Sequence, residues 1–296
     1  MITCRTHGGG GGGVGSWTVE QFARGAHDVV GVDLETPSET RENVDFKAAD
    51  LTDYGETRQL VEAAEPDAVV HLAAIPNPED HAGSRVFETN VTSTYNVLDA
   101  AGAVGARIVQ ASSESLYGTV FAEDDWLPDA LPIDEETPTE PEDPYGLSKV
   151  VGEEVAARVA RRYGVGAVSL RSSWVTYPGE TKTREAREGF DPETAALSGN
   201  GWSHIDVRDL VRAIEAAIDA DIDGHEAVLV AAAENFLGRD TAATIEAVHG
   251  ELPAACAIEG TESIFDCSKA ARVLGWEPDH SWRDAEDASV TGPAFV

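Results

Sequence analysis

Positive charge is scarce in this chain. Among its 296 residues, 54 are Asp or Glu and 21 are Lys or Arg, which gives a formal net charge of −33 at pH 7. A surface of this sign repels nucleic acid and anionic membranes, so we expect neither as a partner. Self-repulsion of this size destabilises a compact state at low salt, and the composition therefore predicts a halophilic protein that folds best in molar salt.

Cysteines and long apolar runs are also scarce. Cys4, Cys256 and Cys267 are too few and too scattered for a disulfide framework, and no Cys/His spacing resembles a metal site. No apolar run approaches the roughly 18 residues of a membrane span, and no basic patch followed by an apolar stretch marks a signal peptide. These absences favour a cytoplasmic protein with no bound metal.

Apolar strands alternate with helical patterns along the chain. Strands are predicted at 28–33, 68–73, 106–111, 166–171 and 226–231, and helices near 15–25, 56–65, 84–104, 144–163, 207–220, 239–249 and 268–274. Continuous apolar strands separated by helices indicate a parallel sheet that is covered on both faces. The predicted fold is therefore α/β, a doubly wound parallel sheet of the Rossmann type with a small C-terminal substrate-binding lobe.

The remaining segments divide the chain. Residues 118–143 and 176–204 are rich in Pro, Gly or charged residues and are predicted to be loops. We expect residues 1–172, with parts of 205–232, to form the nucleotide-binding domain. The small lobe is expected to comprise residues 173–204 and 233–296.

A glycine run precedes the first predicted helix. Residues 8–13 are all Gly, and Val14 and Gly15 follow. Such a turn at a helix N-terminus lets backbone N–H groups approach a pyrophosphate. Asp33 ends the next strand, where an acid holds a ribose 2′-hydroxyl and repels a 2′-phosphate, so the pattern predicts NAD rather than NADP. The segment before the run contains Arg5 and His7, which suit a buried strand poorly, and the first strand is expected to be weak.

Tyr145 and Lys149 lie four residues apart in Asp143-Pro144-Tyr145-Gly146-Leu147-Ser148-Lys149. On a helix both side chains emerge from one face, one turn apart. An ammonium group beside a phenol favours the phenolate, so we expect Lys149 to lower the pKa of Tyr145 and make it a base. Asp143 and Pro144 are suited to begin that helix.

Taken in order, these motifs resemble the extended short-chain dehydrogenase/reductase family, in its NAD-dependent epimerase/dehydratase branch. The similarity runs over roughly residues 8–275, although Gly8 replaces the threonine of the family's glycine motif. The resemblance implies Ser113, Tyr145 and Lys149 as the catalytic group. It implies cofactor binding by Gly9, Gly12, Val14, Gly15, Asp33, Asp50, Leu51, Leu72, Ala73, Ala74, Asn90, Tyr145 and Lys149.

The substrate side is less defined. Ser113, Ser115, Tyr117, Ser173, Trp174 and Arg184 are the predicted substrate-binding residues. Lys182, Arg184 and Arg187 form either an anion clamp for a diphosphate or an ordinary solvated loop, and the pattern favours neither. Only about two dozen residues separate the predicted substrate loop from the next helix, fewer than the resemblance implies for nucleotide-sugar epimerases.

Three functions remain open. The first is an NAD-dependent epimerase of a nucleotide sugar of the UDP-sugar type, which is slightly favoured. The second is an NAD-dependent dehydrogenase of a free sugar, uronate or sugar phosphate. The third is a non-catalytic NAD-binding regulatory protein, which the presence of Ser113, Tyr145 and Lys149 disfavours. The resemblance also implies a homodimer formed through the helices at 84–104 and 144–163.

Overall fold

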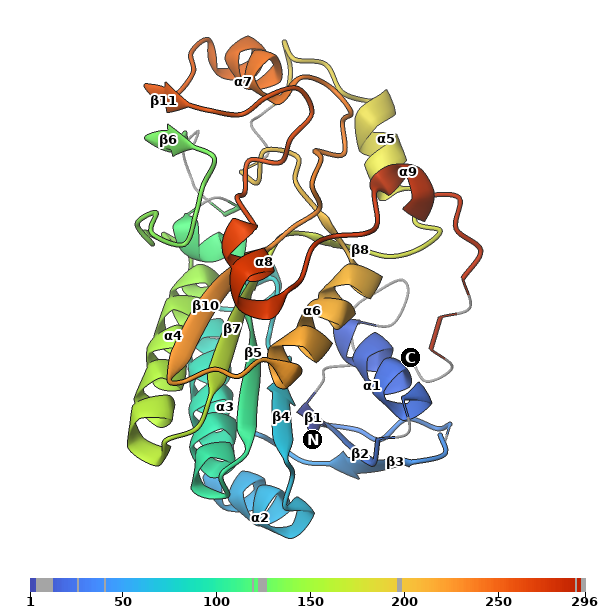
Figure 1. The fold of residues 1–296 in the computed structure, drawn as a ribbon, viewed down its shortest axis with the longest axis vertical. Helices are drawn as coiled ribbons and strands as arrows, with labels where there is room; N and C mark the ends of the chain where they lie inside the picture. The colour runs from blue at the N-terminus through green and yellow to red at the C-terminus, as the bar shows by residue number, and fades with distance from the viewer. Residues whose placement is uncertain are drawn as a thin grey trace.

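The centre of the molecule is a parallel sheet with helices on both faces (Figure 1). The structure is a computed structural model, and it describes residues 1–3, 13–25, 27–39, 41–118, 120–121, 127–195, 199–290 and 292–293. The strand order is β10-β7-β5-β4-β1-β2-β3, and each neighbouring pair is parallel. The strands are β1 Ile2–Thr3, β2 Val29–Asp33, β3 Val44–Ala48, β4 Ala68–His71, β5 Arg107–Ser113, β7 Ala167–Ser172 and β10 His225–Val230.

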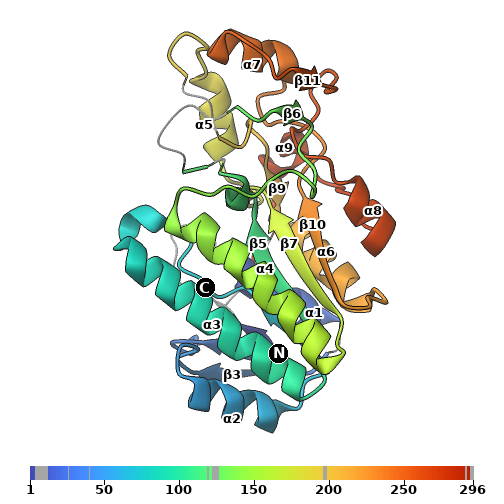
Figure 2. The same cartoon turned by 90° about the vertical axis from the view of Figure 1, so that its left-hand side faces the viewer.

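Two groups of helices cover the sheet, and each has its own apolar core. One face carries α1 Val14–Arg24, α6 Val207–Asp219 and α8 Ser268–Leu274, and the other carries α2 Tyr54–Ala64, α3 Gly83–Ala103 and α4 Pro144–Tyr163. Figure 2 shows α3 and α4 side by side in front of the sheet, with α1 and α6 behind it. The predicted doubly wound α/β fold is confirmed.

Helix α4 begins where the sequence places it. The Asp143 carboxylate accepts from the backbone N–H groups of Tyr145 and Gly146 at 2.8 and 2.9 Å, and Pro144 occupies the first turn. A side chain at Gly146 would put its Cβ 2.6 Å from the Ser115 carbonyl oxygen. Glycine at this position therefore lets the start of α4 approach the segment that follows β5.

Two strands from the N-terminal part of the chain, β1 and β3, bear on the sequence predictions. The short strand β1 lies between β2 and β4, with Ile2 opposite Gly31 and Val70. Strand β3 was not predicted, because Val44-Asp-Phe-Lys-Ala48 alternates apolar and charged residues. It lies at the edge of the sheet and is mostly exposed, so charged side chains cost little there.

A third core lies at the carboxyl ends of the strands and forms the small lobe. Leu131, Trp202, Phe236, Ile258 and Phe265 are among its buried residues. Its elements are η2 Glu114–Tyr117, β6 Ala130–Leu131, β8 Val175–Thr176, α5 Lys182–Glu188, β9 Ile205–Asp206, α7 Thr241–His249, β11 Ala255–Cys256 and α9 Trp282–Ala285. A further short turn, η1, spans Pro78–Asp80 before α3.

The lobe draws on more of the chain than expected. Strand β6, within the predicted loop 118–143, pairs with β11, and α5 forms within the predicted loop 176–204. The proposed division at 172 and 232 stays a prediction. In the described residues, no helix has both the length and the apolar character needed to cross a membrane.

Candidate active site

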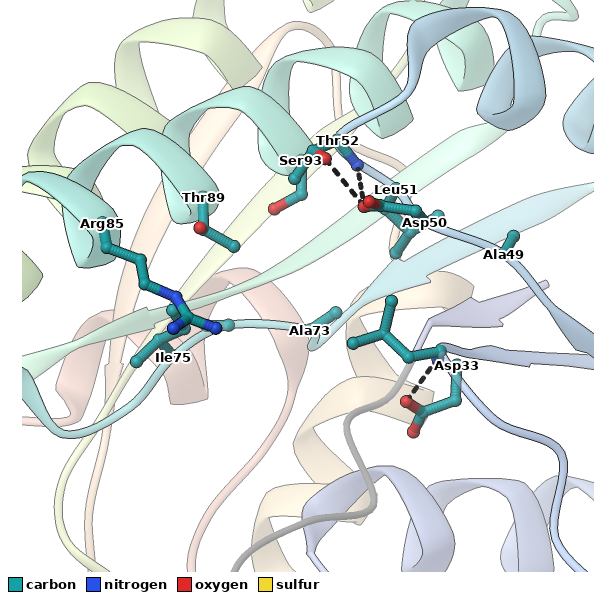
Figure 3. Close-up of a pocket in the computed structure, with 12 residues that line it drawn as sticks. Asp33, Ala49, Asp50, Leu51, Thr52, Ala73, Ile75, Arg85, Thr89 and Ser93 are labelled. Carbon is teal, nitrogen blue, oxygen red and sulfur yellow. Dashed lines mark hydrogen bonds between the residues drawn. The ribbon is translucent and has the colours of Figure 1, made fainter. Parts of the chain in front are cut away.

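Two cavities lie along the carboxyl ends of the parallel strands, which is where open α/β sheets bind their ligands. The first, of about 110 Å³, lies beyond β2 and β4 (Figure 3). The second, of about 320 Å³, lies beyond β5 and β7 beside Tyr145 and Lys149. Together they trace a path from the Asp33 end of the sheet to the start of α4.

The first cavity collects residues predicted to hold the adenosine half of a dinucleotide. Asp33 is 8% exposed, and its carboxylate accepts from the Leu34 N–H at 2.6 Å. The Asp50 carboxylate accepts from the N–H and the hydroxyl of Thr52 at 2.9 and 2.7 Å (Figure 3). Its lining residues are Asp33, Leu34, Ala49, Asp50, Leu51, Thr52, Ala73, Ala74, Ile75, Arg85, Thr89 and Ser93.

Three residues of this cavity were missed by sequence reasoning. Arg85, Thr89 and Ser93 all lie on α3 and line the cavity (Figure 3). They are four residues apart, which places them on one face of the helix. That spacing is visible in the sequence, but it gains meaning only when α3 is known to flank β4.

The second cavity lies between the start of α1 and the start of α4. Gly13, Val14 and Gly15 line it from the start of α1, and Tyr145 and Lys149 line it from α4. Gly9 and Gly12, also predicted to bind the cofactor, lie outside the described residues. The other lining residues are Leu72, Ala74, Pro76, Ala111, Ser112, Leu170, Ser172, Trp174, Val175, Tyr177, Leu210 and Ile214.

Tyr145 and Ser113 are brought together as predicted, but the pKa of Tyr145 moves the other way. Burial raises this pKa to about 12, a hydrogen bond with the Ser113 side chain lowers it, and the charges of Asp143 and Glu114 raise it. The expected lowering by Lys149 is absent, because the Lys149 Nζ lies 5.2 Å from the ring centroid and donates to the Ala111 carbonyl oxygen at 2.8 Å. The protein alone therefore keeps the phenol protonated.

The pKa of Lys149 is also shifted. Its side chain is buried, and burial lowers its pKa to about 8, while the charge of Glu153 raises it. A lysine in this state keeps a proton at neutral pH but releases it more readily than an exposed one. The pair thus consists of a phenol and an ammonium group whose pKa values lie about four units apart rather than being matched.

The serines after β5 form a compact hydrogen-bonded turn. The Ser113 hydroxyl accepts from the Ser115 N–H at 3.1 Å and donates to the Ser115 hydroxyl at 3.1 Å. The neighbouring Ser112 donates to the Glu153 carboxylate at 2.6 Å. Ser113 is thereby held beside Tyr145, with which it is hydrogen-bonded, whereas Ser112 is bonded to Glu153 on α4 and is the one of the two serines that lines the second cavity.

Comparison with known proteins identifies the chain. Residues 8–231 match the NAD dependent epimerase/dehydratase family. The chain belongs to this family. The predicted family and its enzymatic nature are confirmed, and so is NAD as the cofactor; the preference for NAD over NADP stays a prediction.

Relatives within this family differ in activity. The chain is 36% identical to the L-arabinose 1-dehydrogenase (NAD(P)(+)) of Haloferax volcanii over 62% of this chain and 70% of the relative. It is 26% identical to the UDP-glucose 4-epimerase of Lactobacillus helveticus over 92% of this chain and 91% of the relative. A solved UDP-galactose 4-epimerase superposes with a TM-score of 0.67 and 27% identity, covering 97% of this chain and 96% of that one.

In this member of the epimerase/dehydratase family, the side chains of Asn90 and His71 both have polar partners within the protein. The Asn90 amide oxygen accepts from the Ile75 N–H at 2.7 Å, and its nitrogen donates to the Ile75 carbonyl and the Ser148 hydroxyl at 3.1 and 3.2 Å. The His71 Nε2 lies 3.1 Å from the Thr94 hydroxyl, and burial lowers the pKa of His71 to about 3. Asn90 thus ties the β4 loop to α3 and α4, and its predicted contact with the cofactor stays a prediction.

Tyr117, predicted to bind substrate, is instead part of the lobe core. It is 2% exposed, its hydroxyl donates to the Asp134 carbonyl at 2.9 Å, and it accepts from Arg171 at 2.7 Å. The Arg171 guanidinium also bonds Glu153 with both oxygens at 2.8 and 2.9 Å. A phenol bonded on both sides in this way stabilises the lobe and does not face either cavity.

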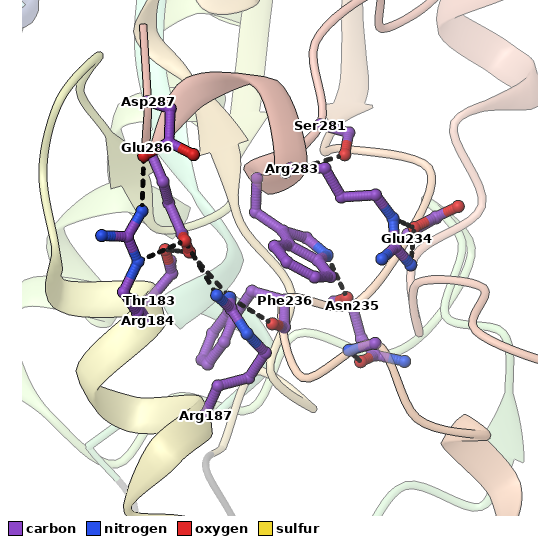
Figure 4. A network of polar contacts seen from close by, with 12 residues as sticks. Thr183, Arg184, Arg187, Glu234, Asn235, Phe236, Ser281, Arg283, Glu286 and Asp287 are labelled. Atoms are coloured by element: carbon purple, nitrogen blue, oxygen red, sulfur yellow. Dashed lines mark hydrogen bonds and ion pairs between the residues drawn. The ribbon is translucent and has the colours of Figure 1, made fainter.

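Of the two interpretations left open for Lys182, Arg184 and Arg187, the ion pairs do not favour the anion clamp. The Arg184 guanidinium is paired with Glu286 and Asp287, and the Arg187 guanidinium is paired with Glu286 at 2.7 and 2.8 Å (Figure 4). Lys182 is paired with Glu180 at 3.1 Å. The sequence could not show this, because Glu286 is about a hundred residues away in the chain. The three cations are compensated from within the protein.

Proposed function

We propose that this protein is an NAD-dependent dehydrogenase of a free sugar, most simply an aldose that is oxidised at its anomeric carbon. The observation that carries the proposal is the pairing of Arg184 and Arg187 with Glu286 (Figure 4). A nucleotide sugar brings a diphosphate, and binding a diphosphate needs cations that are free to face it. Among the described residues that line the 320 Å³ cavity, Lys149 is the only cation.

The size of the lobe supports the same choice. Between β8 and β9 the described chain contains one short helix, α5, of 7 residues. A free sugar is small and uncharged, so a compact lobe with no unpaired cationic clamp suits it. The relative with 36% identity, the L-arabinose 1-dehydrogenase of Haloferax volcanii, is also a dehydrogenase of a free sugar.

The residues fit the cofactor. Asp33, Asp50 and Leu51 line the first cavity, and Gly13, just before α1, lines the second, which supports a dinucleotide laid across both. NAD, when bound, supplies the acceptor for the hydride. Because Asp33 would repel a 2′-phosphate, we expect NAD to bind more tightly than NADP, and titration with both nucleotides checks this.

The chain's own residues handle the proton. In the proposed reaction the Tyr145 oxygen takes the proton of the sugar hydroxyl, and Ser113 holds that hydroxyl in reach of Tyr145. Lys149 does not lower the pKa of Tyr145 in the protein alone; in the proposed reaction its positive charge, 5.2 Å from the centroid of the phenol ring, would help to hold the cofactor. Since burial sets the pKa of Tyr145 at about 12, the phenolate fraction grows with pH, and oxidation is expected to accelerate from neutral to alkaline pH.

An absorbance assay tests the function. The protein, purified in molar salt because of its charge of −33, is mixed with NAD and a panel of aldoses, uronates and UDP-sugars. We expect NADH to accumulate with a free aldose or uronate and not with a UDP-sugar. Interconversion of UDP-glucose and UDP-galactose without net NADH would replace this proposal by the epimerase, which full-length similarity to two such enzymes keeps as the second candidate. Silence with every substrate, despite NAD binding, would favour the regulatory alternative.

Association and location remain proposals. We infer a homodimer through α3 and α4, where Tyr95 and Leu147 are 40% and 45% exposed. Sedimentation in molar salt tests it, and a monomer at every concentration would contradict it. The cytoplasmic location stays a prediction.

A further inference from the structure

Glu114 is a buried carboxyl group directly after Ser113, at the first position of η2. Only 3% of it is exposed. Burying a carboxyl group costs free energy unless hydrogen bonds compensate, so its partners show what the position is for. Nothing in the sequence pattern distinguishes Glu114 from the other 53 acidic residues of the chain.

Its partners come from two segments of the lobe. The Ser173 side chain and the Trp174 backbone, both between β7 and β8, lie next to the carboxyl group and lower its pKa. It also faces the Asn200 amide nitrogen, with 3.5 Å between Nδ2 and Oε1. One side chain beside the catalytic serine therefore connects two parts of the chain that meet only in the folded protein.

Asn200 is also hydrogen-bonded to the turn at residues 201–203, whose backbone is strained. Its amide oxygen accepts from the Trp202 N–H at 3.1 Å, and its nitrogen donates to the Ser203 carbonyl at 3.1 Å. Gly201 and Trp202 both have positive φ, of 55° and 58°. A bulky residue in this region is unfavourable and persists only where its surroundings hold it. The Asn200 side chain is one of those restraints.

The two segments meet again behind the cavity. Trp174 lines the 320 Å³ cavity beside Tyr145, and its ring packs edge-on against Phe236 with 5.5 Å between centroids. The Phe236 N–H donates to the Trp202 carbonyl at 2.9 Å. Glu114, Asn200, Trp202, Phe236 and Trp174 thus form a ring of contacts, and this ring holds the Trp174 side of the cavity against the lobe.

On the basis of the sugar dehydrogenase proposed above, we infer that Glu114 is a positioning residue of the sugar pocket. Its carboxyl group holds the wall at Ser173 and Trp174 against the Asn200–Trp202 turn. It acts through these residues and not on the sugar itself. Removing the carboxyl group should therefore weaken sugar binding more than cofactor binding.

The same group links the pocket to pH. Burial raises the pKa of Glu114 to about 8, and the neighbouring Ser173 and Asn200 side chains and the Trp174 backbone lower it. The titratable group that faces it from α4 is Tyr145, whose pKa the Glu114 charge raises. The partners from the other elements are neutral. As pH rises through 8, a negative charge forms beside the base and opposes its ionisation.

The experiment compares Glu114→Gln with Glu135→Gln as a matched control. Glu135 is a half-buried carboxylate of the lobe, which accepts from the Leu229 N–H at 2.7 Å and lines neither the 110 Å³ nor the 320 Å³ cavity. For E114Q we expect the KM for the sugar to rise about tenfold, with the KM for NAD changed by less than about twofold. The pH midpoint of oxidation should shift to lower pH, because the charge that opposes phenolate formation is gone. E135Q should leave all three quantities near the wild-type values.

A fluorescence titration tests the same inference without activity. Trp174 and Trp202 both lie in this network, so the wild type should show a change in tryptophan emission centred near pH 8, retained in E135Q and lost in E114Q. If no sugar is oxidised but this transition behaves as described, the proposed function fails and the positioning role stands. A transition that persists in E114Q, or equal rises in both KM values, would overturn the positioning role.

If E114Q does not fold, Ser173→Ala removes one contact and leaves the carboxyl group in place. We then expect a smaller rise in the KM for the sugar, of about threefold, and a further rise in the pKa of the fluorescence transition, since one neighbour that lowers the pKa of Glu114 is lost. An unchanged transition in S173A would contradict the inferred network.

Discussion

Lys149 on α4 and the Arg184–Arg187 pair on α5 are cationic side chains in two regions of this protein, and their surroundings differ. Lys149 is buried and donates to a backbone carbonyl, and burial lowers its pKa to about 8. Arg184 and Arg187 are bonded to the Glu286 carboxylate, and Arg187 also stacks on Trp282 with 3.8 Å to the ring centroid (Figure 4). The charge at Lys149 remains available for chemistry, whereas the charge at the arginines stabilises the lobe.

The role of a cationic residue, whether it binds a ligand or stabilises the fold, therefore cannot be assigned from the sequence until its carboxylate partners are known. In a chain with 54 acidic residues, a carboxylate partner is available almost anywhere, and a paired arginine is the expected outcome. A lysine that is buried without such a partner costs free energy. It is the latter kind of residue that marks a functional site.

The largest effect should come from the residue beside Lys149. Tyr145→Phe removes the oxygen that takes the substrate proton, and turnover should fall at least about 100-fold, the low end for general acid–base catalysis. The affinity for NAD should barely change. Steady-state kinetics and NAD titration on the same preparation check both parts, and normal turnover by the variant would remove Tyr145 from the mechanism.

Lys149→Met should separate activity from stability. We expect most of the activity to be lost and the melting temperature at pH 7 to rise, because a buried ammonium group is replaced by an apolar chain of similar length. Since the folded-state pKa is lowered from 10.5 to about 8, the penalty in the wild type is complete below pH 8 and vanishes above 10.5. It is on the order of 3 kcal/mol.

The gain in melting temperature should therefore shrink between pH 8 and pH 10.5, which thermal unfolding across this range measures. A variant that melts below the wild type at pH 7 would show that the hydrogen bond to Ala111 outweighs the burial of charge.

Glu286→Gln tests the second region. It leaves Arg187 without its carboxylate, and we expect a loss of about 2 kcal/mol in the free energy of unfolding, below the range for fully buried pairs. The pairing lowers the pKa of Glu286 to about 2, so its stabilisation is present above pH 4.5 and lost as pH falls towards 2. The variant should lack that acid-induced loss, as denaturant titrations at pH 7 and pH 3 would reveal.

Arg184→Ala should have the smallest effect. Its side chain is 36% exposed, so its ion pairs contribute little to stability. The KM for the sugar should stay within about twofold of the wild type. A large rise in that KM would return Arg184 to the substrate-binding residues, and the paired and unpaired cations would no longer differ in role.

Much of the site was readable from local pattern. Asp143, Pro144 and the Tyr145–Lys149 spacing specify the start and face of α4, because capping and helical periodicity depend on neighbours in the chain. Asp33 at the end of β2 and the turn before α1 are local in the same sense. The roles of Tyr117, Arg184 and Glu114 were not readable, because each depends on a partner from a distant segment: Arg171, Glu286 and Asn200.

The sequence alone determined the main alternation of strands and helices and the pair on α4, since these follow from periodicity, caps and short spacings. Only the tertiary structure decided which charges are compensated, which tyrosine reaches the cavity and how far burial moves the pKa of Tyr145 and Lys149. The physical reason is that desolvation and ion pairing depend on what surrounds a group in space, and the surroundings of a buried side chain come from residues far away in the sequence.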